Sequence, residues 1–168
     1  GIVTSRSVRV GGDAFDAAIV NYIKSEYNLL IGERTAEEVK MAIGSAAKLS
    51  GESDARIRGR DLVSGLPKDL MVTPKEIREA IEDQLVKIIS AIKATLDETP
   101  PDLVADLSRT GIVLAGGGAL LKGLSERLTK EAGMPVRVAE DPLYSVVTGA
   151  GKCVENIAML QQILAPEK

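Results

Sequence analysis

The sequence predicts an α/β fold, and three observations support this prediction. Hydrophobic residues make up 45% of the 168 residues but aromatic residues only 2%, so the core must consist of Ile, Leu, Val and Ala. Segments with helical apolar spacing alternate with short β-branched runs. In the last third of the chain, a strand-like run, a glycine turn, a helix and another strand follow one another, which is the order of α/β proteins.

The composition argues against several classes of function. A net charge of −3 provides no basic excess for a phosphate backbone, so nucleic acid is not an expected partner. Without histidine, neither a Ser-His-Asp triad nor a common zinc site is possible. The single cysteine, Cys153, points to a reducing, cytoplasmic compartment and is interpreted as an inert small hydrophobe. No apolar run approaches the roughly 20 residues of a membrane-spanning helix.

The N-terminal third predicts one strand and two helices. Ile2–Val10 has the rough alternation of a strand, although no upstream segment is present to pair with it. Asp13 occupies the N-cap position of a helix, with Asp16 as a favourable charge in its first turn. Thr35–Glu38 has the form of a capping box that opens a second helix.

The middle of the chain predicts a hairpin or β-meander and a long helix. Two strand-like runs, Arg56–Val63 and Asp69–Val72, are separated by a Gly-Leu-Pro turn. Thr73, Pro74 and Glu76 then specify a helix start through an N-cap, a first-position proline and a capping box. The predicted apolar stripe of this helix comprises Ile77, Ile81, Leu85, Ile88, Ile92 and Leu96. The Thr-Pro-Pro sequence that follows ends the helix and is a candidate hinge.

The C-terminal third predicts alternating strands and helices. Ile112–Ala115 is a continuous apolar run, as in a strand buried on both faces of a parallel sheet. A helix marked by leucines, a strand over Pro135–Ala139 and a helix capped by Asp141 follow. A last helix is expected over about residues 154–164. Two further glycines, Gly149 and Gly151, suggest close packing of a helix against the sheet or a ligand.

The glycine turn after the apolar strand is the best candidate binding site. Gly116, Gly117 and Gly118, followed by Ala119, lie between a strand and a helix. Glycines there allow positive φ and close approach of a ligand, and a helix start offers free N–H groups, so a nucleotide suits the turn. It is not a P-loop, because no Gly-Lys-Ser/Thr follows. The alternative is a tight connection that binds nothing.

The helix that opens at Thr35 offers a second candidate surface. Glu37, Lys40, Met41 and Gly44 share the face opposite its apolar stripe. Such a face could hold an adenosine. The alternative is a solvated i, i+3 ion pair between Glu37 and Lys40, worth about 0.2–0.5 kcal/mol.

Three stretches together resemble the MreB family of rod-shape-determining bacterial actins: Ile2–Asp13, Asn28–Glu37 and Leu114–Leu121. The likeness extends over essentially the whole chain. It implies the fold shared by actin, sugar kinases and heat-shock chaperones, in which two similar lobes close on ATP and Mg²⁺. The chain resembles the second lobe, an RNase H-like lobe whose mixed sheet is flanked by helices, with a smaller inserted α+β subdomain.

The resemblance also implies domain boundaries and site residues. Residues 1–30 and 101–168 would form the RNase H-like core subdomain, and residues 31–100 the inserted subdomain. Gly116, Gly117, Gly118 and Ala119 would line the adenosine and its α-phosphate. Glu37 and Lys40 would clamp the adenine and ribose. No catalytic residue or metal ligand is expected in the chain, because the family's phosphate-binding hairpins and Mg²⁺-linked carboxylates belong to segments that would precede Gly1.

The implied parent is an ATP-dependent, filament-forming cytoskeletal ATPase that directs cell-wall synthesis and rod shape. Its expected partners are further copies of itself, head to tail, and cell-shape and cell-wall synthesis proteins. It is expected in the cytoplasm at the inner face of the membrane, associating with the membrane mainly through the other lobe. The chain alone should turn over negligible ATP and should expose a sheet edge prone to pairing. A lobe of a small-molecule kinase or of a chaperone-type ATPase is the alternative.

Overall fold

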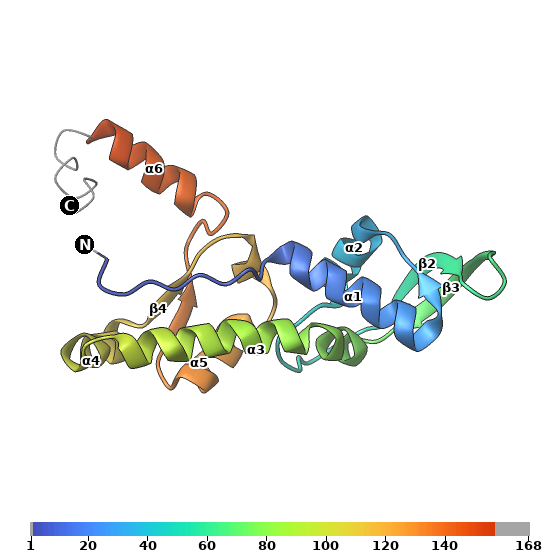
Figure 1. Ribbon diagram of the computed structural model, residues 1–168, viewed down its shortest axis with the longest axis horizontal. Coiled ribbons are helices and arrows are strands. Elements are labelled where there is room, and N and C mark those ends of the chain that lie inside the picture. Colours follow the sequence, from blue (N-terminus) through green and yellow to red (C-terminus); the bar gives the residue numbers. More distant parts are fainter. Residues whose placement is uncertain (1, 157–168) are drawn as a thin grey trace.

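The computed structural model describes residues 2–156 of the chain. Helices and strands alternate along it, so the predicted α/β fold class is confirmed (Figure 1). The elements in order are α1 (Gly12–Tyr27), β1 (Leu29–Leu30), α2 (Glu33–Ile43), β2 (Ala55–Asp61), β3 (Pro67–Val72), α3 (Pro74–Glu98), α4 (Pro101–Thr110), β4 (Ile112–Leu114), the 3₁₀ helix η1 (Gly117–Leu120), α5 (Leu124–Ala132), β5 (Val136–Val138) and α6 (Ser145–Glu155).

The strands of the described residues form two sheets. In one sheet, β1, β2 and β3 are antiparallel in that order. The β2–β3 register runs from Ala55 opposite Val72 to Arg60 opposite Pro67, which confirms the predicted hairpin. Pro67 begins β3 instead of lying in the turn, since an edge strand tolerates a missing N–H. In the other sheet, β4 and β5 pair in parallel, as the order strand, helix, strand predicts.

The main hydrophobic core lies where α1, α2 and α3 meet the antiparallel sheet. Ile19 and Ile23 of α1 are fully buried, as are Ile77 and Ile81 of α3. The predicted stripe of α3 is confirmed as buried as far as Leu85. Beyond it, Ile88 and Ile92 are partly buried against the core, and Ile89, which is not in the predicted stripe, is buried. The i, i+4 row thus continues into the core, while Ile88 turns toward a groove described below.

The start of α3 confirms the predicted capping box. The Glu76 N–H donates to Thr73 Oγ1 over 3.3 Å, and the Thr73 N–H donates to Glu76 Oε2 over 2.7 Å. Pro74 occupies the first turn, where no intrahelical N–H bond is lost. The Tyr27 hydroxyl at the end of α1 donates to Glu76 as well. One carboxylate therefore caps α3 and ties it to α1.

Two predicted N-terminal features are wrong. Residues 2–10 form no strand, because none of the described strands pairs with them. Helix α1 begins at Gly12 with Gly11 as N-cap and no side-chain cap, so Asp13 lies in the first turn instead of capping it. The extended backbone of Gly11, with φ −141° and ψ −164°, allows this earlier start.

The capping box predicted at Thr35 is also absent. Helix α2 begins at Glu33, and its N-cap is Gly32, which makes no side-chain cap hydrogen bond. Thr35 therefore lies inside the first turn. Glu38, the expected acidic partner in that capping box, instead accepts a hydrogen bond from Arg34 Nε over 3.1 Å, one turn earlier.

The region around β4 departs from the prediction in three ways. Helix α4 is not predicted by the sequence; it has no buried residue and begins with a proline in its first turn. Strand β4 is not buried on both faces, because Val113 is 48% exposed in a two-stranded sheet. The helix expected directly after the glycine turn is the short η1, and α5 starts only at Leu124, after Gly123 adopts a left-handed conformation.

Helix α6 starts later and packs less than predicted. Asp141 does not cap it: residues 141–144 form a turn, and α6 begins at Ser145. Figure 1 shows α6 projecting from the rest of the chain, and no residue of α6 is buried. Among the described residues, no atom outside the helix and the adjoining residues lies within 4 Å of the place that a Cβ would take at Gly149 or Gly151, so neither packs closely against the sheet there. Cys153 is exposed, not an apolar filler. Most of the helix predicted over 154–164 lies outside the described residues.

The free edge of β4 leads to a prediction of self-association. In the described residues β4 pairs only with β5, so its other edge presents unpaired backbone groups. We expect light scattering to show association that increases with concentration, and Val113→Lys to reduce it by placing a charge on that strand. Val147→Lys on α6, where Val147 is 62% exposed, is the matched control and should change nothing. A strictly monomeric chain at high concentration would contradict this expectation.

Candidate functional site

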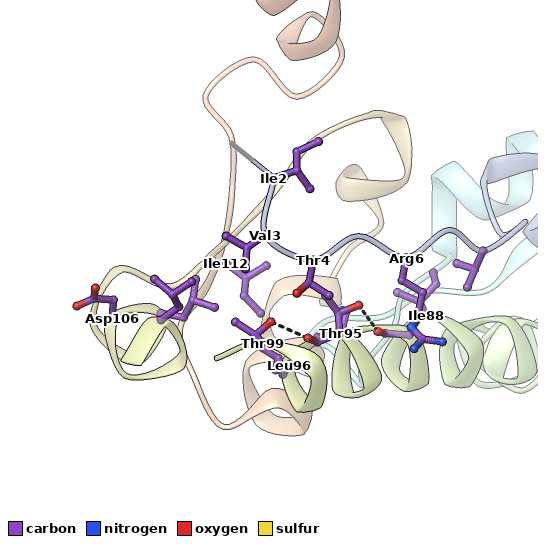
Figure 2. Close-up of a pocket in the computed structure, with 15 residues that line it drawn as sticks. Ile2, Val3, Thr4, Arg6, Ile88, Thr95, Leu96, Thr99, Asp106 and Ile112 are labelled. Atoms are coloured by element: carbon purple, nitrogen blue, oxygen red, sulfur yellow. Dashed lines mark hydrogen bonds between the residues drawn. The ribbon is translucent and has the colours of Figure 1, made fainter. Parts of the chain in front are cut away.

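The best-formed groove of the described structure is not at the predicted site. It has a volume of about 620 Å³ and lies between the N-terminal segment, α3, α4 and the start of β4. Figure 2 shows Val3 and Thr4 of that segment above Thr95 and Leu96 of α3 and Thr99 just after it. None of the predicted site residues lines this groove.

The groove has few polar groups with which to bind a nucleotide. The threonines at the end of α3 are engaged by the helix, because Thr95 Oγ1 donates to the carbonyl of Ala91 over 2.8 Å and Thr99 Oγ1, at the C-cap, donates to that of Thr95 over 2.7 Å (Figure 2). Arg6 is paired with Glu98. Most other lining side chains are aliphatic. The groove is therefore an apolar surface and does not compete with the glycine turn as a nucleotide site.

The glycine turn connects β4 to η1 through an unusual backbone conformation. Gly116 has φ 87° and ψ 169°, a region essentially restricted to glycine. Its N–H donates to the carbonyl of Pro142 over 2.7 Å, which joins the turn to the segment before α6. Gly117 and Gly118 have ordinary negative φ, and a Cβ at Gly117 would lie 3.5 Å from Leu143 Cδ2. Only Gly116 is thus required by backbone geometry.

The turn offers backbone donors to a ligand. Among the described residues, the N–H groups of Gly117 and Gly118 make no hydrogen bond to the protein, as expected for the first residues of a helical turn. No atom lies within 4 Å of the place a Cβ of Gly118 would take, so this side of the turn is open. Ala119, the fourth predicted residue, is 6% exposed and anchors η1. These features fit a phosphate or sugar oxygen.

The second predicted surface lies on α2. Glu37 is exposed and forms no ion pair with Lys40. The alternative of a solvated Glu37–Lys40 pair is therefore wrong. Lys40 instead pairs with Asp16 of α1, its Nζ lying 2.8 Å from Asp16 Oδ1. Met41 is 69% exposed on the same helix. The carboxylate of Glu37 makes no ion pair within residues 2–156.

The end of α2 and the segment after the glycine turn are joined by backbone contacts. Ser45 and Lys122 form an isolated parallel β-bridge, and the Ala46 N–H donates to the Lys122 carbonyl over 2.7 Å. The Lys122 ammonium donates to the carbonyl of Ala42 over 2.8 Å, close to the negative end of the α2 dipole. The two halves of the predicted site are therefore connected through residues just beyond each of them.

Arg127 of α5 reinforces this connection. Its guanidinium donates to Glu82 of α3 over 2.8 Å, to the carbonyl of Ala46 over 3.4 Å and to Glu131 over 3.2 Å. The hydrogen bond to Glu82 is the main cause that raises the pKa of Arg127 above its ordinary value. Its charge is thus fixed where α5, α3 and the end of α2 meet.

Sequence reasoning misses the roles of Asp16 and Lys122. The sequence suggests only a first-turn charge for Asp16, yet this residue is 7% exposed and paired with a residue on another helix. No local spacing links it to Lys40, so only the packing of α1 on α2 reveals the pair. Lys122 follows a leucine pair in a segment expected to be helical, and its contacts depend on the left-handed Gly123 beside it.

Residues 2–156 contain neither a metal-binding cluster nor a membrane-spanning helix. No group of three or more His, Cys, Asp or Glu side chains there is placed to hold a metal ion. No helix in that range combines the length and apolar character needed to cross a bilayer.

Comparison with known proteins identifies the family. Residues 1–162 match the family model of the MreB/Mbl protein. The chain is 48% identical over 159 residues to the cell shape-determining protein MreB of Escherichia coli (strain K12), covering 95% of the chain and 46% of that protein. It is 46% identical over 159 residues to the cell shape-determining protein Mbl of Bacillus subtilis (strain 168), covering 95% of the chain and 48% of that protein. The chain spans about half the length of these relatives.

Solved structures agree with the sequence comparison. The crystal structure of MreB5 of Spiroplasma citri bound to ADP matches with a TM-score of 0.90 and 41% identity, over 94% of this chain and 48% of that one. The MamK double helical filament matches with a TM-score of 0.73 and 23% identity, over 86% of this chain and 44% of that one, which supports the actin-like fold alone. The chain belongs to the MreB/Mbl family.

Proposed function

We propose that the chain is the adenosine-binding lobe of an ATP-dependent, filament-forming bacterial actin that directs cell-wall synthesis and rod shape. Gly116, Gly117, Gly118 and Ala119 would line the adenosine and its α-phosphate. Glu37 and Lys40 would hold the adenine and ribose from α2. Membership of the MreB/Mbl family favours this function over a small-molecule kinase or a chaperone-type ATPase.

The observation that carries the proposal is the backbone connection between the two predicted surfaces. The bridge between Ser45 and Lys122 keeps the end of α2 next to the segment that follows the glycine turn. A base and sugar bound against α2 could then place a phosphate near the free N–H groups of Gly117 and Gly118. The MreB5 structures bound to ADP and to AMPPNP, at TM-scores of 0.90, support an adenine nucleotide as the ligand.

The two subdomains belong to the same proposal. Residues 1–30 and 101–168 would form the core subdomain, and residues 31–100 the inserted one. The pairs Asp16–Lys40 and Ser45–Lys122 both cross this proposed division. Mg²⁺ would be held by phosphate and by carboxylates outside this lobe, where it would neutralise phosphate charge.

The proposed partners follow from the family. The protein would assemble head to tail with further copies, since a heterologous contact propagates as a filament. The double helical filament of MamK is one assembly formed by a protein of this fold. Cell-shape and cell-wall synthesis proteins would be further partners. The protein would act in the cytoplasm at the inner face of the membrane, held there mainly by the other lobe.

Nucleotide binding at the glycine turn can be tested with Gly117→Val. Because Gly117 has negative φ and only Leu143 near its Cβ position, valine should leave the fold intact while filling the space beside the turn. In an NMR titration with ADP, we expect the amide signals of Gly117 and Gly118 to shift in the native chain. We expect the variant to raise the ADP Kd about 5- to 150-fold, since overpacking costs about 1–3 kcal/mol.

Gly149→Val on the exposed α6 is the matched control, because no atom lies near its Cβ position either. It should leave the ADP Kd unchanged. The site would be contradicted if the amide signals of Gly117 and Gly118 did not shift when ADP is added to the native chain. It would also be contradicted if Gly117→Val bound ADP with native affinity.

A further inference from the structure

The most buried ion pair in the described part of the chain joins Lys40 of α2 to Asp16 of α1. Lys40 Nζ lies 2.8 Å from Asp16 Oδ1 and 2.9 Å from Oδ2, and it also donates to the Gly12 carbonyl over 3.3 Å. The Lys40 and Asp16 side chains are only 14% and 10% exposed. The end of one lysine side chain is therefore held by two groups from the first turns of α1.

Stability alone gives a weak reason for this pair. Removing two charges from water costs several kcal/mol per ion, and an apolar pair of similar volume often stabilises a protein as well or better. Asp16 Oδ1 accepts no hydrogen bond within the described residues, because its contact with Nζ lacks hydrogen-bond geometry and is purely ionic. An incompletely satisfied buried carboxylate adds to the cost.

The pair does fix the position of a flexible group. A lysine ammonium has three N–H donors on a mobile four-carbon stem. Two of these donors are directed at Asp16 Oδ2 and the Gly12 carbonyl, so at most one would remain for a ligand. Asp16 is itself only 7% exposed and offers little surface for a direct contact. Any effect of Asp16 on a ligand must therefore pass through Lys40.

We propose that Asp16 is a positioning residue for nucleotide binding. This inference rests on the proposed function, in which Lys40 contacts the adenosine. By holding the ammonium beside α1, Asp16 presents the remaining N–H donor in one arrangement, so nucleotide binding does not have to order that side chain. The same contact fixes α2, and with it Glu37, relative to the start of α1.

A double-mutant cycle on ADP affinity tests the proposal. Asp16→Asn is nearly isosteric and removes the charge, and Lys40→Met removes the ammonium while keeping most of the stem. We expect Asp16→Asn to raise the ADP Kd about tenfold, the size of a lost charge-assisted hydrogen bond. In the Lys40→Met background the same substitution should change the Kd less than about twofold, because no ammonium remains to be positioned. Thermal unfolding followed by circular dichroism checks that each variant is folded.

The matched control is Asp69→Asn on β3, which removes a carboxylate that pairs with Arg56 of β2 and not with Lys40. It should leave the ADP Kd unchanged. Asp16→Glu provides a second variant in case Asp16→Asn fails to fold. It keeps the charge pair but displaces the ammonium by about one methylene, so positioning predicts weaker ADP binding and a purely structural role predicts native affinity.

The outcomes separate this inference from the proposed function. If Lys40→Met weakens ADP binding but Asp16→Asn, or Asp16→Glu in its place, binds with native affinity, the positioning role is refuted and the nucleotide site stands. Equal losses from Asp16→Asn with and without Lys40 also refute it, because the effect would then not pass through the ammonium. If both Lys40→Met and Gly117→Val bind ADP as the native chain does, the proposed site itself is wrong.

Discussion

Gly111→Ala is expected to destabilise the chain by about 2 to 6 kcal/mol, combining backbone strain of about 1–3 kcal/mol with steric displacement of similar size. Gly111 links α4 to β4 with φ 79° and ψ 177°, a conformation that other residues rarely adopt. A Cβ there would lie 2.6 Å from the Pro135 carbonyl oxygen. That oxygen accepts the Ile112 N–H over 2.8 Å at the start of the β4–β5 pairing. Alanine would therefore strain the backbone and separate the two strands.

Chemical denaturation measures this loss, and Gly116→Ala is the matched control. Gly116 has a similar conformation, φ 87° and ψ 169°, but no atom within 4 Å of its Cβ position. Its free energy of unfolding should fall only by the backbone strain, about 1–3 kcal/mol. Equal free energies of unfolding for the two variants would show that the contact with Pro135 has no effect.

Ile81→Ala is expected to cost about 2–5 kcal/mol, the range for removing a fully buried aliphatic side chain and leaving a cavity. Ile81 is 0% exposed and lies in the first half of α3, in the core shared with α1 and the antiparallel sheet. Ile19 and Ile23 of α1 are equally buried, so little room exists for the core to collapse around the missing atoms. In urea denaturation, the substitution should lower the midpoint concentration and leave the m-value unchanged.

The control on the same helix is Val86→Ala. Val86 is 46% exposed, and its truncation should change the free energy of unfolding by no more than about 0.5 kcal/mol. A similar loss for both variants would mean that α3 is stabilised by helix propensity and not by its buried face.

Local sequence signals predict the elements that depend on neighbouring residues. The capping box at Thr73 and the first-turn Pro74 are interactions within one turn of helix, so they form wherever that helix forms. The β2–β3 hairpin likewise depends on adjacent strands and a short connection. In contrast, the predicted starts of α1 and α2 are misplaced because glycines at residues 11 and 32 take the N-cap position without any side chain to signal it.

The candidate site is predictable only in part, because some of its features are local in the chain and others are long-range contacts. The positive φ of Gly116 follows from a glycine between a strand and a helical turn, which is a local property. The partner of Lys40 is not local. The amphipathic spacing of α2 indicates which face Lys40 shares with Glu37, but nothing in the spacing indicates that this face meets Asp16.

The sequence by itself determined the α/β class, the long capped helix, the hairpin and the glycine turn, because each arises from interactions between residues close together in the chain. Only the tertiary structure decided that Asp16 holds Lys40, that Lys122 joins the end of α2, and that residues 2–10 pair with none of the described strands. These features depend on which elements lie side by side, and contacts between residues far apart in the chain leave no periodic pattern from which to infer them.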